Sequence, residues 1–98
     1  IMTISYKTKI VTATPYTVSS DDEVLFINVS SPSSVVLSAS SSGRSVYIKD
    51  YSGLATTNPI TITAAGGKTI DGVSFAILNG GYSHIQIVYD GTNWKTIS

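Results

Sequence analysis

The sequence predicts an all-β fold, a small β-sandwich or jelly roll. Polar and apolar side chains alternate with period two along most of the chain, as they do on β-strands. Glycine, Asp-Gly and Asn-Pro steps recur between these short runs, and no window shows the three-to-four-residue spacing of a helix. About eight or nine short strands at this turn frequency are typical of sandwiches, jelly rolls and related barrels. A chain of 98 residues has room for one such core, so we expect a single domain over residues 1–98.

The first third of the chain predicts two strands of different character. Alternation over residues 3–14 indicates a long strand with a mixed face, which Pro15 interrupts. Residues 18–22 then form a polar turn. The run over residues 24–29 is apolar on both faces except at Asn28, which indicates a central strand covered on both sides.

The middle of the chain predicts two further strands and two loops. After a break at Pro32, residues 35–37 supply a short strand, and the small polar residues 38–43 form a loop. Residues 44–49 alternate again and are expected to form a strand. Residues 50–58 carry turn residues and form the second loop.

The last part of the chain predicts a tight meander. Residues 59–63 alternate cleanly behind a proline that suits a strand start, and Gly66-Gly67 is expected to join them to a strand over residues 68–70. Asp71-Gly72 is a strong hairpin signal because glycine tolerates positive φ. The final strands are expected over residues 74–78, 82–89 and 93–97.

Composition narrows the classes of partner. Lys+Arg 6 against Asp+Glu 6 gives a net charge of +0, and the basic residues are scattered, which argues against nucleic acid. No apolar run approaches the roughly 20 residues of a membrane helix, so no membrane insertion is expected. Cys 0 removes disulfides and thiolate metal sites. A small neutral domain without such staples is expected to associate with copies of itself.

The sequence lacks the residues of a familiar active site, so we expect no enzyme, no cofactor and no metal. His84 is the only histidine, and a base for serine needs a third group to hold it. Asp71 and Asp90 precede glycines and are explained by turns. The acidic run over residues 21–23 lacks the alternate-residue spacing of a calcium loop.

Aromatic side chains provide the candidate binding residues. Tyrosine and tryptophan offer flat, amphipathic surfaces that stack on sugars or fill protein interfaces. Tyr16 and Tyr51 are expected in loops and therefore exposed, and Tyr47 and Arg44 complete the candidate set. Burial in a core or a subunit interface is the competing expectation for each aromatic residue.

Four stretches in fixed order resemble a module found in bacteriophage tail fibres, tailspikes and appendages. They are SVYIKDYSG over residues 45–53, NPITI over 58–62, TIDG over 69–72 and DGTNW over 90–94. With the polar start at residues 21–22, the resemblance covers residues 21–98. It leaves residues 1–20 open as a first strand or a shaft remnant.

The resemblance implies a function as well as a fold. It implies a homotrimer of jelly-roll-like protomers, similar to tumour-necrosis-factor-type knobs, at the tip of a fibre on a virion tail, an appendage or a bacterial cell. The tip would bind a glycan or envelope protein of a host or prey cell, with Trp94 as a packing anchor. A purely structural trimerisation cap or decoration module without a ligand is the alternative, and a hydrolase using His84 is a third reading.

Overall fold

A computed structural model describes residues 5–38 and 40–98 of the chain. Those residues form strands, turns and loops without a helix, so none of them builds a helix long and apolar enough to cross a membrane. The strands are β1 (Thr8–Val11), β2 (Tyr16–Thr17), β3 (Val24–Ile27), β4 (Ser33–Leu37), β5 (Ser45–Asp50), β6 (Ile60–Ala64), β7 (Phe75–Leu78), β8 (His84–Tyr89) and β9 (Trp94–Thr96).

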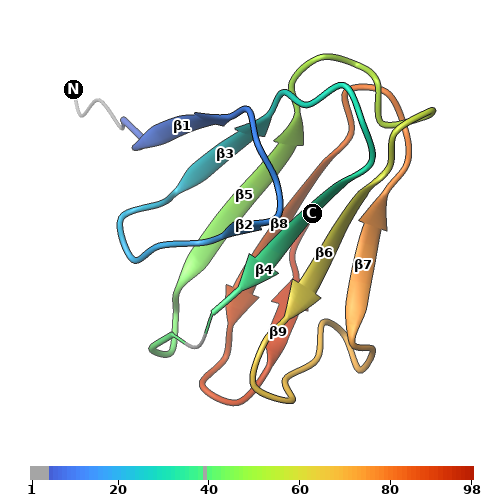
Figure 1. Cartoon of the computed structure of the whole chain (residues 1–98). Coiled ribbons are helices and arrows are strands. Elements are labelled where there is room, and N and C mark those ends of the chain that lie inside the picture. The colour runs from blue at the N-terminus through green and yellow to red at the C-terminus, as the bar shows by residue number, and fades with distance from the viewer. Residues whose placement is uncertain (1–4, 39) are drawn as a thin grey trace.

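The strands form two mixed sheets that face each other (Figure 1). The first sheet has the order β1-β3-β5-β8-β9, and the second has the order β2-β4-β6-β7. Buried and open positions alternate along the strands, as β5 and β8 show most regularly. The prediction of an all-β fold with two packed layers is confirmed.

The topology differs from the antiparallel one that a jelly roll requires. From β1 to β6 the chain changes sheet at every connection, so that β1, β3 and β5 run parallel, as do β2, β4 and β6. Antiparallel pairing is confined to β5 with β8, β6 with β7, and β8 with β9. The first six strands therefore wind as a flattened coil, which the last three strands close.

Three prolines mark the points where this coil enters the second sheet. Pro15, Pro32 and Pro59 each stand immediately before β2, β4 and β6, in that order. Proline has no N–H to donate to a sheet ladder, which confines it to strand starts and edges. The connections that contain these prolines carry the chain across to the opposite sheet instead of turning it back as a hairpin.

Two predictions about the first strands are wrong in detail. The expected long strand over residues 3–14 is shorter, because β1 covers Thr8–Val11 and the chain then bends at Pro15 into the other sheet. Residues 3 and 4 lie outside the described part. The strand expected over residues 24–29 is central in its sheet, but the outward side chains of Val24 and Phe26 are only half-buried, not covered on both sides.

The predicted meander is also wrong. Residues 68–70 form no strand, and β6 pairs directly with β7 across the connection of residues 65–74. The Asp71-Gly72 turn is nevertheless confirmed, since both residues have positive φ (51° and 87°) and Ile70 and Val73 exchange two backbone hydrogen bonds across it. The remaining strands lie within a few residues of their predicted bounds.

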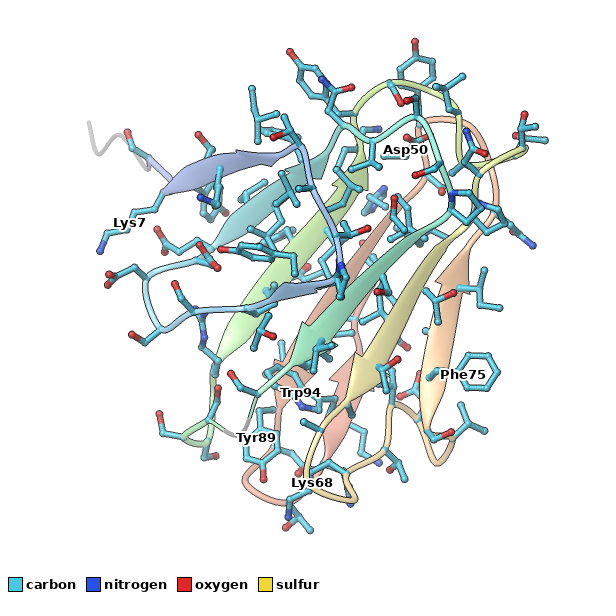
Figure 2. All side chains as sticks on the ribbon, viewed as in Figure 1. Lys7, Asp50, Lys68, Phe75, Tyr89 and Trp94 are labelled. Carbon is cyan, nitrogen blue, oxygen red and sulfur yellow. The ribbon has the colours of Figure 1, made fainter. Side chains whose placement is uncertain are left out.

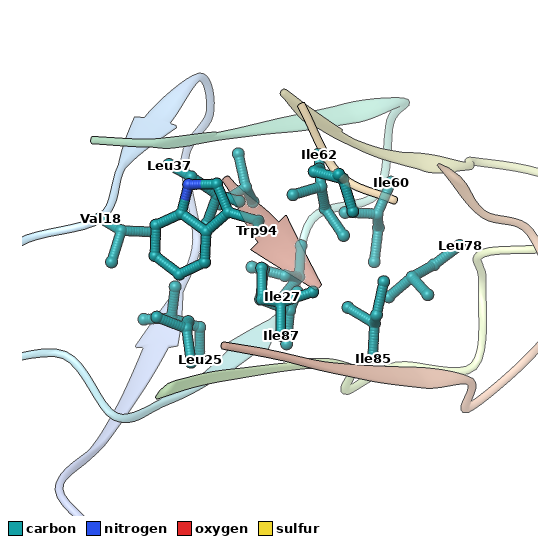
Figure 3. Close-up of a cluster of buried hydrophobic side chains, with 14 of the residues drawn as sticks. Val18, Leu25, Ile27, Leu37, Ile60, Ile62, Leu78, Ile85, Ile87 and Trp94 are labelled. Atoms are coloured by element: carbon teal, nitrogen blue, oxygen red, sulfur yellow. The ribbon is translucent and has the colours of Figure 1, made fainter. Parts of the chain in front are cut away.

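The core fills the space between the sheets (Figure 3). Inward side chains of both sheets meet there, and those that are fully enclosed are Leu25, Ile27, Val35, Leu37, Val46, Ile48, Ile60, Ile62, Ile70, Ile87 and Trp94. Tyr89 packs against the Trp94 ring with the centroids 5.1 Å apart. The expected role of Trp94 as a packing anchor near the C-terminus is confirmed.

Candidate functional site

The four residues predicted to bind a ligand do not form one site. Tyr47 and Tyr51 lie on the outer side of the five-stranded sheet, whereas Tyr16 and Arg44 lie around the connection between β2 and β3. The loops over residues 40–44 and 51–58 precede and follow β5, so they lie at opposite ends of the molecule (Figure 1). A single apex built from both loops is therefore absent in the part of the chain that the structure describes.

Tyr47 and Tyr51 belong to a larger group, which we call the aromatic face. It comprises Tyr6, Phe26, Tyr47, Tyr51 and Tyr82, and so holds five of the nine aromatic residues of the chain. Phe26 pairs with Lys49 in the register of β3 with β5, while Val24 pairs with Tyr47, and all four side chains point away from the core. Alternation along β3 and β5 thus places the rings of Phe26 and Tyr47 on the solvent side of the sheet.

The rings of the aromatic face are arranged in close pairs. Tyr6 and Tyr47 have centroids 5.4 Å apart, and Phe26 and Tyr51 have centroids 5.7 Å apart, both tilted at 57°. Lys49 Nζ lies 5.9 Å from the centroid of Tyr82 and also donates a hydrogen bond to the Tyr82 carbonyl oxygen. A hydrogen bond with Tyr6 raises the pKa of Tyr47. These contacts hold the rings in place while leaving Tyr6, Tyr51 and Tyr82 exposed.

The predicted set lacks three members of this face, Tyr6, Phe26 and Tyr82. Alternation along the first strand puts Tyr6, Thr8 and Ile10 on one side, and that side is the outer one. The alternation does not specify which strands are neighbours in the sheet. Phe26 lies beside the end of β5 only because β3 pairs with β5 in this parallel register.

Tyr16 is a strand residue of β2 rather than a loop residue. Its hydroxyl donates to Asp22 Oδ2 over 2.6 Å, and the Ser19 N–H donates to the same oxygen over 2.8 Å. Lys9 Nζ lies 5.6 Å from the Tyr16 ring centroid. Partial burial, together with the hydrogen bond to Asp22, raises the pKa of Tyr16 to about 12. Tyr16 therefore fixes the turn over residues 18–22 and is not free as a stacking surface.

The residues that carry the resemblance have structural roles. Asp50 is 2% exposed, and its Oδ2 accepts from the N–H groups of Ala55 and Tyr82, both over 3.0 Å. Gly53 has φ +81°, and a Cβ there would lie 2.6 Å from the Tyr82 ring. Asp50 therefore ties the loop after β5 to the turn before β8, which positions Tyr51 and Tyr82.

The two Asp-Gly steps are also explained by hydrogen bonds, which are local at Asp90 and reach strand β9 at Asp71. Asp90 Oδ1 accepts from the N–H groups of Thr92 and Asn93, over 2.8 and 2.9 Å. Asp71 accepts from the N–H and the hydroxyl of Thr96. These bonds lower the pKa of both carboxyl groups. The matched motifs thus build the closing turns of the fold, as expected for Asp71-Gly72 and Asp90-Gly91.

One pair has the composition of a nucleophile and its base. His84 Nε2 lies 3.1 Å from Ser98 Oγ, and both residues are exposed. The hydrogen bonds found among the described residues give His84 no carboxylate to orient its ring. Within residues 5–38 and 40–98 no three His, Cys, Asp or Glu side chains gather closely enough to hold a metal ion.

A second apolar surface lies on the four-stranded sheet, and we call it the β7 strip. Val73, Phe75 and Ile77 alternate along the chain, so they project together from the outer side of that sheet, with exposed fractions of 57%, 47% and 47%. Figure 2 shows Phe75 pointing away from β7 at the margin of the molecule. β7 is an edge strand, and its outward neighbours on β6 are Thr61 and Thr63.

A comparison with models of protein families and with curated proteins found no match for this chain.

Proposed function

We propose that this chain is a non-enzymatic adhesive domain at the tip of a fibre, which works as a homotrimer and binds a carbohydrate or protein of a cell surface. The fibre would belong to a virion tail, an appendage or an extracellular bacterial structure. The observation that carries the proposal is the aromatic face, which leaves Tyr6, Tyr51 and Tyr82 exposed on one side of a rigid sheet.

The chemistry of the aromatic face suits a sugar. Phenol and phenyl rings offer apolar surface for stacking, and the tyrosine hydroxyls donate and accept hydrogen bonds at the rim. Tyr51 and Tyr82 stand on a loop and a turn that the buried Asp50 carboxylate holds together. Loops fixed on a rigid scaffold are where binding residues are usually presented. Binding of this kind needs no cofactor and no metal.

The β7 strip supports the assembly half of the proposal. In an antiparallel pair, every second residue forms backbone hydrogen bonds with the partner strand. Ser74 is such a residue, because its carbonyl accepts from the Ala64 N–H. The backbone N–H and C=O groups of Phe75 and Ile77 therefore point away from β6, toward the free edge of the sheet. Natural edge strands are usually protected by lysine, proline or a bulge, and β7 carries neither lysine nor proline. Since the chain has a net charge of +0, copies do not repel one another.

Binding assays on matched variants test the proposed function. The wild type is applied to a glycan array and to envelope fractions of bacterial cells, beside Tyr47→Ala and Tyr51→Ala. We expect each substitution to weaken binding by about tenfold or more, because aromatic anchors dominate such interfaces. Ile97→Ala removes an exposed apolar side chain outside the aromatic face and serves as the control, which should bind like the wild type.

A wild type that binds neither glycans nor envelope fractions would contradict the adhesive role.

The roles of the motif residues favour one alternative, a structural cap without a ligand. The motif residues have roles in turns and packing, as seen for Asp50, Gly53, Asp71 and Asp90. The resemblance therefore supports a shared fold and does not by itself support binding of a receptor. A cap would leave Tyr47→Ala and Tyr51→Ala without effect on any attachment.

The hydrolase reading rests on the contact of His84 with Ser98 alone. Release of sugar from a bound glycan by the wild type, lost in His84→Ala, would replace the non-enzymatic proposal. We expect no release from either protein.

A further inference from the structure

A small polar cavity lies at the end of the sandwich where β5 begins, away from the exposed members of the aromatic face. Its volume is about 60 Å³. The polar residues that line it are Ser19, Ser20, Ser38, Ser40 and Arg44, and Trp94 closes its inner side together with Val18 and Leu37. The cavity contains Arg44, which the sequence singled out, and none of the predicted tyrosines.

Trp94 forms part of the wall of this cavity. The residue is 1% exposed, and its Nε1 has no hydrogen-bond acceptor. In Figure 3 the indole nitrogen lies on the edge of the ring that faces Leu37, with Val18 beside the ring, and both of these residues line the cavity. Less than 1 Å² of Nε1 is accessible, so a ligand in the cavity does not reach this N–H, and Trp94 serves as part of the cavity wall.

The donors of the cavity are Arg44 and part of its serine hydroxyls. Arg44 Nη2 donates to the Ser19 carbonyl over 2.8 Å and Nη1 lies 3.5 Å from the Ser45 carbonyl, which holds the guanidinium at the cavity without neutralising it. The hydroxyls of Ser38 and Ser40 donate to the carbonyls of Val18 and Ser38, which leaves those of Ser19 and Ser20 to donate to a ligand. Among the described residues no carboxylate lines the cavity. Asp22, in the loop that carries Ser19 and Ser20, already accepts from Tyr16 and from the Ser19 N–H.

We propose that this cavity binds a small oxyanion, a carboxylate, sulfate or phosphate group, through Arg44 and the hydroxyls of Ser19 and Ser20, with the Trp94 ring as its wall. A fixed positive charge with convergent donors and no acid favours an anion with several acceptor oxygens. A water molecule needs only about 10–15 Å³ of such space, so the cavity has room for a group of this size, although not for a whole sugar ring. The group is either a free ion or an acidic substituent of a larger ligand.

The single tryptophan makes the site directly observable. Trp94 is the only tryptophan of the chain, so a ¹⁵N-labelled sample gives one indole N–H resonance. The wild type is titrated with acetate, sulfate and phosphate, with chloride as the control at matched ionic strength. Glucuronate and glucose form a second pair, which differs in the carboxylate and tests the larger ligand.

We expect a saturable shift of the indole resonance with oxyanions and none with chloride or glucose. A shift with the inorganic ions assigns the site to the free ion, and a shift with glucuronate at lower concentration than acetate assigns it to an acidic sugar. Arg44→Gln should weaken binding by about tenfold or more, because it removes the fixed charge. Lys7→Gln changes the net charge equally at an exposed position that does not line the cavity and should titrate like the wild type.

The proposal is overturned if no oxyanion moves the resonance, if chloride moves it equally, or if Arg44→Gln titrates like the wild type. Ser20→Ala provides a second variant should Arg44→Gln fail to fold, since it removes a lining hydroxyl and should also weaken the shift. The site is independent of the aromatic face, so its failure would leave the proposed adhesive function untouched.

Discussion

Asp50 is a buried carboxylate whose partners are backbone N–H groups. Burial by itself raises the pKa of a carboxyl group, but here the N–H groups of Ala55, Tyr82, Gly53 and Ser52 outweigh it and lower the pKa below its ordinary value. A depressed pKa in the folded chain means stability that is present above the unfolded pKa and lost as the pH falls through the folded one. Asp50 therefore stabilises the loop and turn that carry Tyr51 and Tyr82 at neutral pH.

We predict that Asp50→Asn lowers the free energy of unfolding by about 2 kcal/mol, because the amide presents an N–H₂ group where N–H donors converge. Urea denaturation at neutral pH measures this loss. Repeating the experiment in acid should show a smaller difference between the two proteins, since the wild-type carboxylate is then protonated. Asp21→Asn, at an exposed position, serves as the control and should match the wild type.

Tyr16 gives the opposite pH dependence. Its pKa is raised from 10.0 to about 12, so the folded chain holds the phenol proton more tightly than the unfolded chain. This contribution to stability is complete below pH 10 and is lost as the pH rises toward about 12. We predict that the stability of the wild type falls more steeply over this interval than that of Tyr16→Phe. Equal slopes in urea denaturation would show that the Asp22 contact does not persist in solution.

At the scale of elements, β7 concentrates exposed apolar surface on an unprotected edge. A charged residue in the β7 strip should oppose its burial by a second copy, because an unpaired buried charge is costly. We predict that Phe75→Asp shifts the protein to the monomer at micromolar concentration in sedimentation velocity. Ile97→Asp places the same charge at another exposed apolar position, beside the other sheet, and should keep the assembly. Dissociation by both variants would mean that the interface is not the β7 strip.

The strands were predictable where the side chains alternate, but their partners were not. Period two is the same for parallel and antiparallel strands, so the pattern of β3 or β5 contains no information on which neighbour it pairs with. The coiled topology follows from where the chain crosses between sheets. The sequence pattern predicts breaks or a strand start at the three prolines, Pro15, Pro32 and Pro59. Their shared position immediately before β2, β4 and β6 is the sequence signal for the crossings between sheets.

The closing turns were predictable because their chemistry is local. Asp71-Gly72 and Asp90-Gly91 satisfy their hydrogen bonds within a few residues or with the adjoining strand β9. The segment over residues 68–70 was not, since Ile70 is buried by the core and makes only isolated bridges. A buried apolar residue in a loop has the same sequence pattern as a short strand.

At the scale of the whole molecule, the candidate site could be predicted only in part. Tyr51 was expected to be exposed from its loop position and is, while Tyr16 was assigned to a loop and lies in a strand, bonded to Asp22. Tyr6 and Phe26 complete the aromatic face through neighbours that are far away in the sequence. Register between non-consecutive strands decides which rings meet, and a single sequence does not specify that register.

The surfaces that the fold leaves uncovered are the basis of the proposed assembly. The core is enclosed within one chain, so the protomer does not need partners to bury Trp94 or the inward isoleucines. What remains uncovered is on the outside, as the aromatic face on one sheet and the β7 strip on the other. We expect the β7 strip to be covered by copies of the chain and the aromatic face to remain available for a ligand.

The molar mass of the wild type in solution tests this arrangement most directly. Sedimentation equilibrium at micromolar concentration should give three times the chain mass of 10.3 kDa, together with a mass near that of one chain for Phe75→Asp. A wild type that sediments as a single species of 10.3 kDa across this range would contradict the trimer and the role of the β7 strip.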